Sequence, residues 1–85
     1  MPELCRFLGL VITMYTGDHP PPHFHTRYGD HQATVLFNGS IHSGSLPRRQ
    51  RRLVRKWSRL HQADLEACWA RAIRREPPGT IDPLP

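Results

Sequence analysis

Alternating apolar and polar residues in the first half of the chain predict β-strands. Residues 7–15 are apolar on both faces, which is typical of a central strand. Three further segments also predict strands: residues 23–28, 32–37 and 40–43. Gly29-Asp30 and Asn38-Gly39 are two-residue hairpin signals between them, and Gly9 indicates a bulge in the first strand. We therefore expect an antiparallel meander of three to four strands over about residues 6–43.

A helical spacing of apolar residues replaces this alternation after Ser45, a suitable N-cap, with Pro47 in the first turn. Two groups of apolar residues then point in directions roughly 100° apart. They are Leu53, Val54, Trp57 and Leu60, and then Leu65, Cys68, Trp69, Ala72 and Ile73. One straight helix cannot turn both groups towards the same core. We therefore predict two helices, at about residues 46–60 and 63–76, the second ended by Pro77-Pro78.

Together these elements predict a single α+β domain over residues 1–85, with the small antiparallel sheet packed against two C-terminal helices. A chain of 85 residues buries about 60–65% of its unfolded surface, so its core is thin. The tail at residues 77–85 has no element of its own, and Ile81 and Leu84 are expected to pin it to the core. The apolar helix faces predict core positions for Trp57, Cys68 and Trp69.

Nothing in the chain predicts export or insertion into a membrane. Its longest apolar run, residues 8–15, is much shorter than the about 20 residues that span a bilayer. The N-terminus lacks a charged n-region and a cleavage site. Cys5 and Cys68 lie far apart and do not form a disulfide framework. We therefore expect a cytoplasmic protein with no membrane association.

The segment most suggestive of chemistry is Asp18-His19-Pro20-Pro21-Pro22-His23-Phe24-His25. Its three prolines form a stiff polyproline II spacer, and His23 and His25 are two apart on a predicted strand, so they point to the same face. Imidazole is suited both to proton transfer near neutral pH and to metal binding. A turn at the prolines is needed to bring Asp18 and His19 to the later histidines. We predict Asp18, His19, His23 and His25 as the site residues.

Three interpretations of this segment remain open. In the first, His23 and His25 act as general acid and base, oriented by Asp18 or His19. In the second, His19, His23 and His25 hold a divalent metal ion, although the segment matches no established zinc motif, and no other cofactor is expected. In the third, the role is structural: the imidazoles bond to the backbone and the prolines brace a sheet edge.

The charge of the chain is concentrated in its first predicted helix. The formal net charge is +5, and seven of the twelve Lys and Arg residues lie between positions 48 and 59. They are Arg48, Arg49, Arg51, Arg52, Arg55, Lys56 and Arg59. Arginine binds phosphate in a bidentate manner, so this face predicts binding to RNA or DNA, or to an acidic protein. The alternative is a solvated helix face without a partner.

Several stretches of the chain resemble the bacterial family known as domain of unknown function 4160. They are Met1-Pro2, Arg6-Phe7, the run from Asp18 to His25, Tyr28-Gly29, Gly44-Ser45-Leu46-Pro47, Trp57, Trp69 and Ile81-Asp82-Pro83-Leu84. The resemblance spans nearly the whole chain and is most specific in the histidine–proline run. It implies a toxin of the DhiT type in a type II toxin–antitoxin pair, with a small antitoxin-like protein encoded nearby as its partner.

The resemblance marks Asp18, His19, Pro21, Pro22, His23 and His25 as hallmark positions without assigning them a reaction. The arginine-rich helix departs from the family pattern, in which acidic residues are more often mixed in. We expect a toxin that acts on RNA through the histidine segment, with the arginine helix holding the backbone. The alternatives are a non-enzymatic binding module for nucleic acid or an acidic partner, and a histidine-based metal-binding protein.

Overall fold

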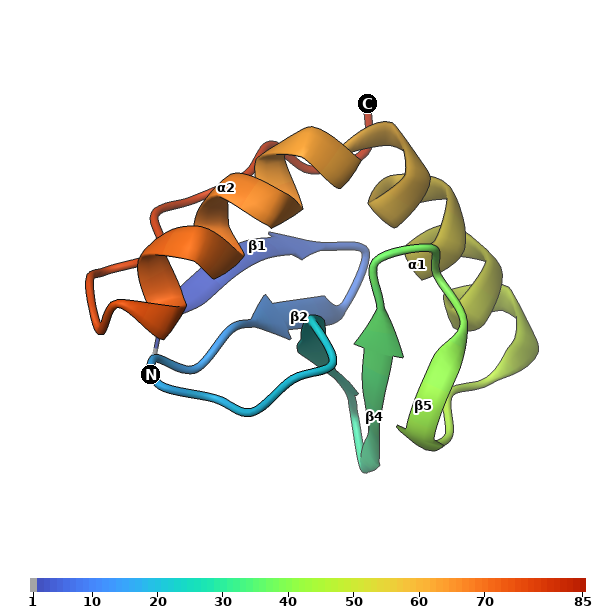
Figure 1. Ribbon diagram of the computed structural model, residues 1–85. Helices are drawn as coiled ribbons and strands as arrows, with labels where there is room; N and C mark the ends of the chain where they lie inside the picture. The colour runs from blue at the N-terminus through green and yellow to red at the C-terminus, as the bar shows by residue number, and fades with distance from the viewer. Residues whose placement is uncertain (1) are drawn as a thin grey trace.

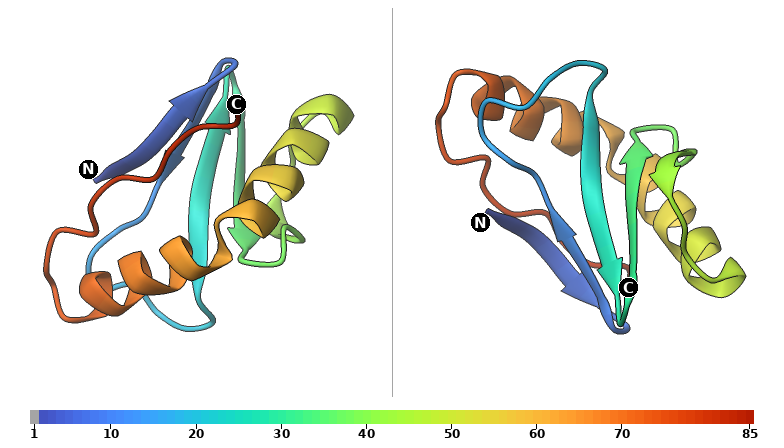
Figure 2. Two further views of the ribbon diagram at one scale, coloured as in Figure 1. Left: turned by 90° about the horizontal axis from the view of Figure 1, so that it is seen from above. Right: turned by 90° about the horizontal axis from the view of Figure 1, so that it is seen from below.

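Five antiparallel strands form one sheet in the computed structural model, which describes residues 2–85. The strands are β1 (Glu3–Phe7), β2 (Leu10–Thr13), β3 (His23–Tyr28), β4 (His31–Leu36) and β5 (Ile41–Gly44), paired in chain order. Helices α1 (Arg48–Leu60) and α2 (Gln62–Ile73) cover one face of the sheet and leave the other uncovered (Figures 1 and 2). The predicted α+β class is confirmed, with one strand more than the largest number expected.

The expectation of one strand over residues 7–15 was wrong, because this segment contains a hairpin. Leu8 and Gly9 form the two-residue turn between β1 and β2, with φ angles of 48° and 81°. Two positive φ angles are what a type I′ turn requires, so Gly9 serves the turn rather than a bulge. The apolar run continues across the turn because both strands face the core, whereas the side chain of Leu8 itself is exposed.

The predicted break between the two helices is confirmed, but both outer ends differ from expectation. Pro47 occupies the N-cap position of α1 without a side-chain cap, and the Ser45 N–H extends the sheet by donating to the Gln32 carbonyl at 3.0 Å. The second helix ends at Ile73, three residues before the expected end, and Arg75 then adopts a positive φ of 61°. Leu60 and Ile73, which the apolar pattern placed on core-facing helix faces, are exposed, and each lies in the last turn of its helix.

The core lies between the sheet and the helices. Trp57, Phe24 and Leu65 are fully buried there, and Trp69 and Cys68 are also buried, as predicted. The C-terminal tail is attached beside β1 (Figure 2): the Ile81 N–H donates to the Leu4 carbonyl at 2.9 Å. The indole of Trp57 donates to the Asp82 carbonyl at 2.8 Å. None of the described helices is long and apolar enough to cross a membrane.

Candidate functional site

The proline-rich loop folds back so that Asp18 lies beside the start of β3. The loop is attached to α2 by the Gly17 N–H, which donates to the Ala72 carbonyl at 2.8 Å. The peptide bond between Pro20 and Pro21 is cis. The chain bends at Pro20 and Pro21 instead of continuing as the expected extended polyproline II spacer, and Asp18 lies beside His23 and His25.

One carboxylate oxygen of Asp18 contacts two imidazoles. Asp18 Oδ2 lies 2.9 Å from His23 Nε2 and 3.1 Å from His25 Nε2. The two imidazole ring centroids are 5.1 Å apart. The other oxygen, Asp18 Oδ1, accepts a hydrogen bond from the backbone N–H of His19 at 2.8 Å. Asp18, His23 and His25 thus form a cluster, whereas His19 is exposed and contacts it only through its backbone.

The two imidazoles of this cluster differ in access. His23 is buried against Trp69 at a centroid distance of 5.4 Å, and its Nδ1 lies 2.6 Å from the Pro21 carbonyl. Both ring nitrogens of His23 therefore have protein partners. The side chain of His25 is 31% exposed and packs edge-on against Tyr15 at 4.4 Å. Of the two imidazoles, that of His25 is therefore the more accessible to a ligand arriving from solvent.

The carboxyl group of Asp18 is held in its ionised form. Burial alone raises the pKa of Asp18. Hydrogen bonds from His25 and from the His19 N–H, together with the charge of His23, outweigh burial and leave the pKa below its ordinary value. The cluster therefore holds one negative charge facing two imidazole nitrogens.

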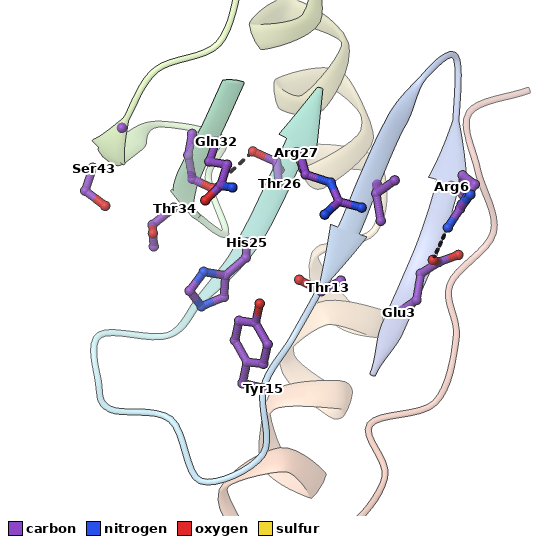
Figure 3. A pocket seen from close by; sticks show the side chains of 13 residues that line it. Glu3, Arg6, Thr13, Tyr15, His25, Thr26, Arg27, Gln32, Thr34 and Ser43 are labelled. Carbon is purple, nitrogen blue, oxygen red and sulfur yellow. Dashed lines mark hydrogen bonds and ion pairs between the residues drawn. The ribbon is translucent and has the colours of Figure 1, made fainter. Parts of the chain in front are cut away.

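His25 opens into a pocket of about 420 Å³ on the uncovered face of the sheet. Figure 3 shows Tyr15, His25 and Arg27 on this face, with the helices behind the sheet. Arg6 and Glu3 also line it and form an ion pair at 2.8 Å. The remaining lining is largely polar and includes Thr13, Gln32, Thr34 and Ser43.

Sequence reasoning did not identify Tyr15, Arg27 or Arg6 as site residues. Arg27 could have been found, because it is two residues after His25 on β3 and therefore shares its face. Tyr15 and Arg6 reach the pocket through the pairing of β1, β2 and β3. That pairing was hidden by the unrecognised hairpin at Leu8.

The arginine-rich helix lies in the other layer of the molecule. All seven basic residues of α1 are exposed, and none of them lines the pocket. Among residues 2–85, none of the seven forms an ion pair with an acidic side chain. The basic face of α1 and the pocket beside His25 are therefore separate surfaces on opposite sides of the sheet (Figures 1 and 3).

Comparison with known proteins identifies one family. No curated protein and no solved structure matches the chain. The family described as Domain of unknown function (DUF4160) matches residues 9–70, which include the whole run from Asp18 to His25. The match covers more than half of the chain, so this protein belongs to the DUF4160 family.

Proposed function

We propose that this protein is the toxin of a bacterial type II toxin–antitoxin pair and that it cleaves RNA in the pocket beside His25. The DUF4160 family, whose resemblance implies a toxin of this kind, motivates the biological part of this proposal. The chemical part is carried by one observation: a histidine held by a carboxylate opens into a pocket that also contains Arg27, on an uncovered sheet face.

The lining of the pocket suits a phosphodiester of a single-stranded nucleic acid. Arg27 presents an exposed guanidinium that forms no ion pair within residues 2–85, and arginine binds phosphate oxygens in a bidentate manner. Tyr15 offers an aromatic ring, and bases of single-stranded RNA commonly stack on aromatic side chains displayed by a sheet. Phosphate and base would then be bound on either side of His25.

The three residues of the cluster would have different roles in this reaction. His25 is the member that contacts the substrate, because it alone reaches the pocket. Asp18 fixes the orientation of the His25 ring through Nε2, as carboxylates do for imidazoles in hydrolytic enzymes. The buried His23 is a positioning residue that fixes Asp18 from the other side.

Cleavage is tested with the purified full chain and a labelled single-stranded RNA. His25→Ala should lower the cleavage rate by at least about 100-fold, since groups of this kind contribute about 10²–10⁴ in rate. Arg27→Ala should weaken RNA binding by roughly 10-fold or more, as a lost charged hydrogen bond does. His42→Ala, which alters an exposed histidine that does not line the pocket, should change neither quantity. Equal cleavage by the wild type and His25→Ala would contradict the proposal.

The toxin assignment has its own test in growing bacteria. Expression of the chain alone should arrest growth, and co-expression of the small protein encoded beside it should restore growth. His25→Ala should fail to arrest growth while accumulating to the same level. Normal growth during wild-type expression would refute the toxin role even if RNA cleavage were found in vitro.

A second candidate function is binding of an acidic protein partner by α1. The observation that favours it is the row of seven exposed basic side chains, without acidic neighbours in the first turn and away from the pocket. An antitoxin with an acidic segment would complement this charge. Arg51→Glu/Arg55→Glu should then weaken the complex strongly at low salt, measured by titration calorimetry. A complex that is unaffected by both charge reversals would rule out this surface.

A further inference from the structure

We infer that Asp18, His23 and His25 form a binding site for one divalent transition-metal ion of the zinc class. One potential ligand atom from each residue lies within 4.8 Å of the others. Binding of the ion stands on this geometry alone. Its role in cleavage rests on the proposed function, and the test below separates the two.

In its neutral form, His23 would direct a nitrogen lone pair into the cluster. The Pro21 carbonyl can only accept, so His23 Nδ1 at 2.6 Å must be the donor. In a neutral imidazole the remaining nitrogen, Nε2, is then an acceptor. It faces Asp18 Oδ2, another acceptor, at 2.9 Å in a side chain that is only 10% exposed. Two acceptors at this distance require a positive species between them, either a proton or a metal ion.

The arrangement of His23 is the one that metal-bound histidines normally have. Such a histidine ligates through one nitrogen and donates its other N–H to a backbone carbonyl or a carboxylate, which fixes the tautomer and the ring orientation. The Pro21 carbonyl supplies that partner for His23. Asp18 is likewise restrained, because Oδ1 is taken by the His19 N–H, which leaves Oδ2, the oxygen that faces both imidazoles, as the ligand atom.

The distances within the cluster suit coordination. Tetrahedral zinc with ligand bonds of about 2.0–2.1 Å separates neighbouring ligand atoms by roughly 3.3 Å. The observed Nε2–Oδ2 separations are 2.9 Å and 3.1 Å. Both lie within a few tenths of an ångström of that value, and the ligand atoms of the two histidines lie within 4.8 Å of each other. Packing restrains the rings near these positions, since His23 lies against Trp69 and His25 against Tyr15.

The ligand set selects the class of metal. Two imidazoles and one carboxylate favour zinc and its transition-metal neighbours, whereas magnesium and calcium prefer oxygen ligands. Catalytic zinc sites usually have three protein ligands and one open position, whereas structural zinc sites have four protein ligands. The open position would face the pocket, the side on which His25 is exposed. An ion bound there would supply a nucleophile, because it lowers the pKa of a coordinated water molecule towards neutral pH.

The site is tested by titrating zinc, and then cobalt as a spectroscopic probe, into metal-free full-length protein in the absence of RNA. We expect one ion per chain, a higher melting temperature with zinc, and a visible cobalt spectrum typical of nitrogen and oxygen ligands. Magnesium at the same concentration should not raise the melting temperature. His25→Ala should reduce zinc affinity by more than about 100-fold, since the loss of a mere supporting partner already reduces it 10–100-fold.

Two control variants separate this site from adventitious binding by histidine. His19→Ala and His42→Ala each remove an exposed imidazole outside the cluster and should leave zinc affinity and stoichiometry unchanged. No saturable binding, or equal weakening by His19→Ala and His25→Ala, would overturn the inference. Zinc binding without RNA cleavage would leave the metal site intact and reject the proposed function. Cleavage of RNA by rigorously metal-free protein would support the proposed function and reject a role of the ion in cleavage.

Discussion

At the scale of the residue, Asp18 carries the cluster because a single oxygen contacts both imidazoles. Removing it leaves the buried Nε2 of His23 without a partner. Asp18→Ala should therefore lower the free energy of unfolding by about 1–3 kcal/mol, measured by urea denaturation in metal-free buffer. His19→Ala is the matched control and should stay within about 0.5 kcal/mol of the wild type, because its side chain is exposed. Equal stability of Asp18→Ala and wild type would contradict this account.

The turn residue Leu8 offers a stabilising substitution. Its φ of 48° is unfavourable for leucine, and its side chain is 62% exposed and so gains little from packing. Leu8→Asn should raise the free energy of unfolding by roughly 1 kcal/mol, because Asn-Gly is the preferred pair for this turn. Leu8→Val places a β-branched residue at the same positive φ and should be destabilising. A melting temperature that Leu8→Asn lowers would show that the turn has another geometry.

The two cysteines should be chemically silent in the folded protein. Burial raises the pKa of the Cys5 thiol and of the Cys68 thiol, so both are protonated and shielded at neutral pH. A thiol reagent should therefore modify neither residue until denaturant is added, as read by mass spectrometry. Rapid labelling of one cysteine under native conditions would show that its part of the core opens.

Residue types alone could identify the cluster only in part. Composition singled out Asp18, His19, His23 and His25, and the structure groups three of them. The fourth, His19, could not be separated from the others, because side chains in an irregular loop follow no periodicity. The direction of each loop side chain is set by how the loop is anchored to α2, which involves a contact between residues 17 and 72.

At the scale of the element, local patterns predicted β3, β4, β5 and the break between the helices. Both signals come from residues that are close in sequence. The Asn38-Gly39 pair predicts the hairpin between β4 and β5, and a change in the direction of the apolar face predicts the break between the helices. The hairpin between β1 and β2 was missed because Leu8 is apolar although it is exposed in a turn. Its neighbours on both strands are buried, so the run looked continuous.

The C-terminal tail lies along the edge of the sheet beside β1. Ile81 is 7% exposed, and its N–H bonds to the Leu4 carbonyl of β1. Ile81→Ala should reduce the free energy of unfolding by about 2 kcal/mol, the lower end for an apolar core truncation. It should also promote association, because β1 is an edge strand that the tail covers. Thr80→Ala, at an exposed position, should change neither stability nor light scattering.

At the scale of the whole molecule, the sheet separates two basic surfaces. The pocket with His25 lies on the uncovered face, and the arginines of α1 lie in the helical layer. The sequence predicted the histidine segment and the arginine helix but not the pocket or its separation from the helix, because a helix that follows the strands can pack on either face of a sheet with the same apolar pattern. We expected the arginine helix to hold the RNA backbone next to the histidines. In the structure, none of its basic residues lines the pocket beside His25.

Separate surfaces predict separable functions. His25→Ala should abolish RNA cleavage and leave binding of the antitoxin-like partner unchanged. Arg51→Glu/Arg55→Glu should weaken partner binding and leave cleavage within a factor of about two, because exposed charges far from a site act weakly at physiological salt. Both activities are measured on the same preparations. Loss of both activities in either variant would show that the two surfaces are coupled.

The bond between Gly17 and Ala72 has a consequence for synthesis on the ribosome. It joins the loop that carries Asp18 to the final turn of α2, and Trp69 of the same helix packs against His23. Chains emerge N-terminus first, so the strands are exposed well before this helix is available. A nascent chain therefore has the residues of the cluster but nothing to hold them in place. If the protein attacks RNA, the ribosome that makes it is spared until α2 has been synthesised.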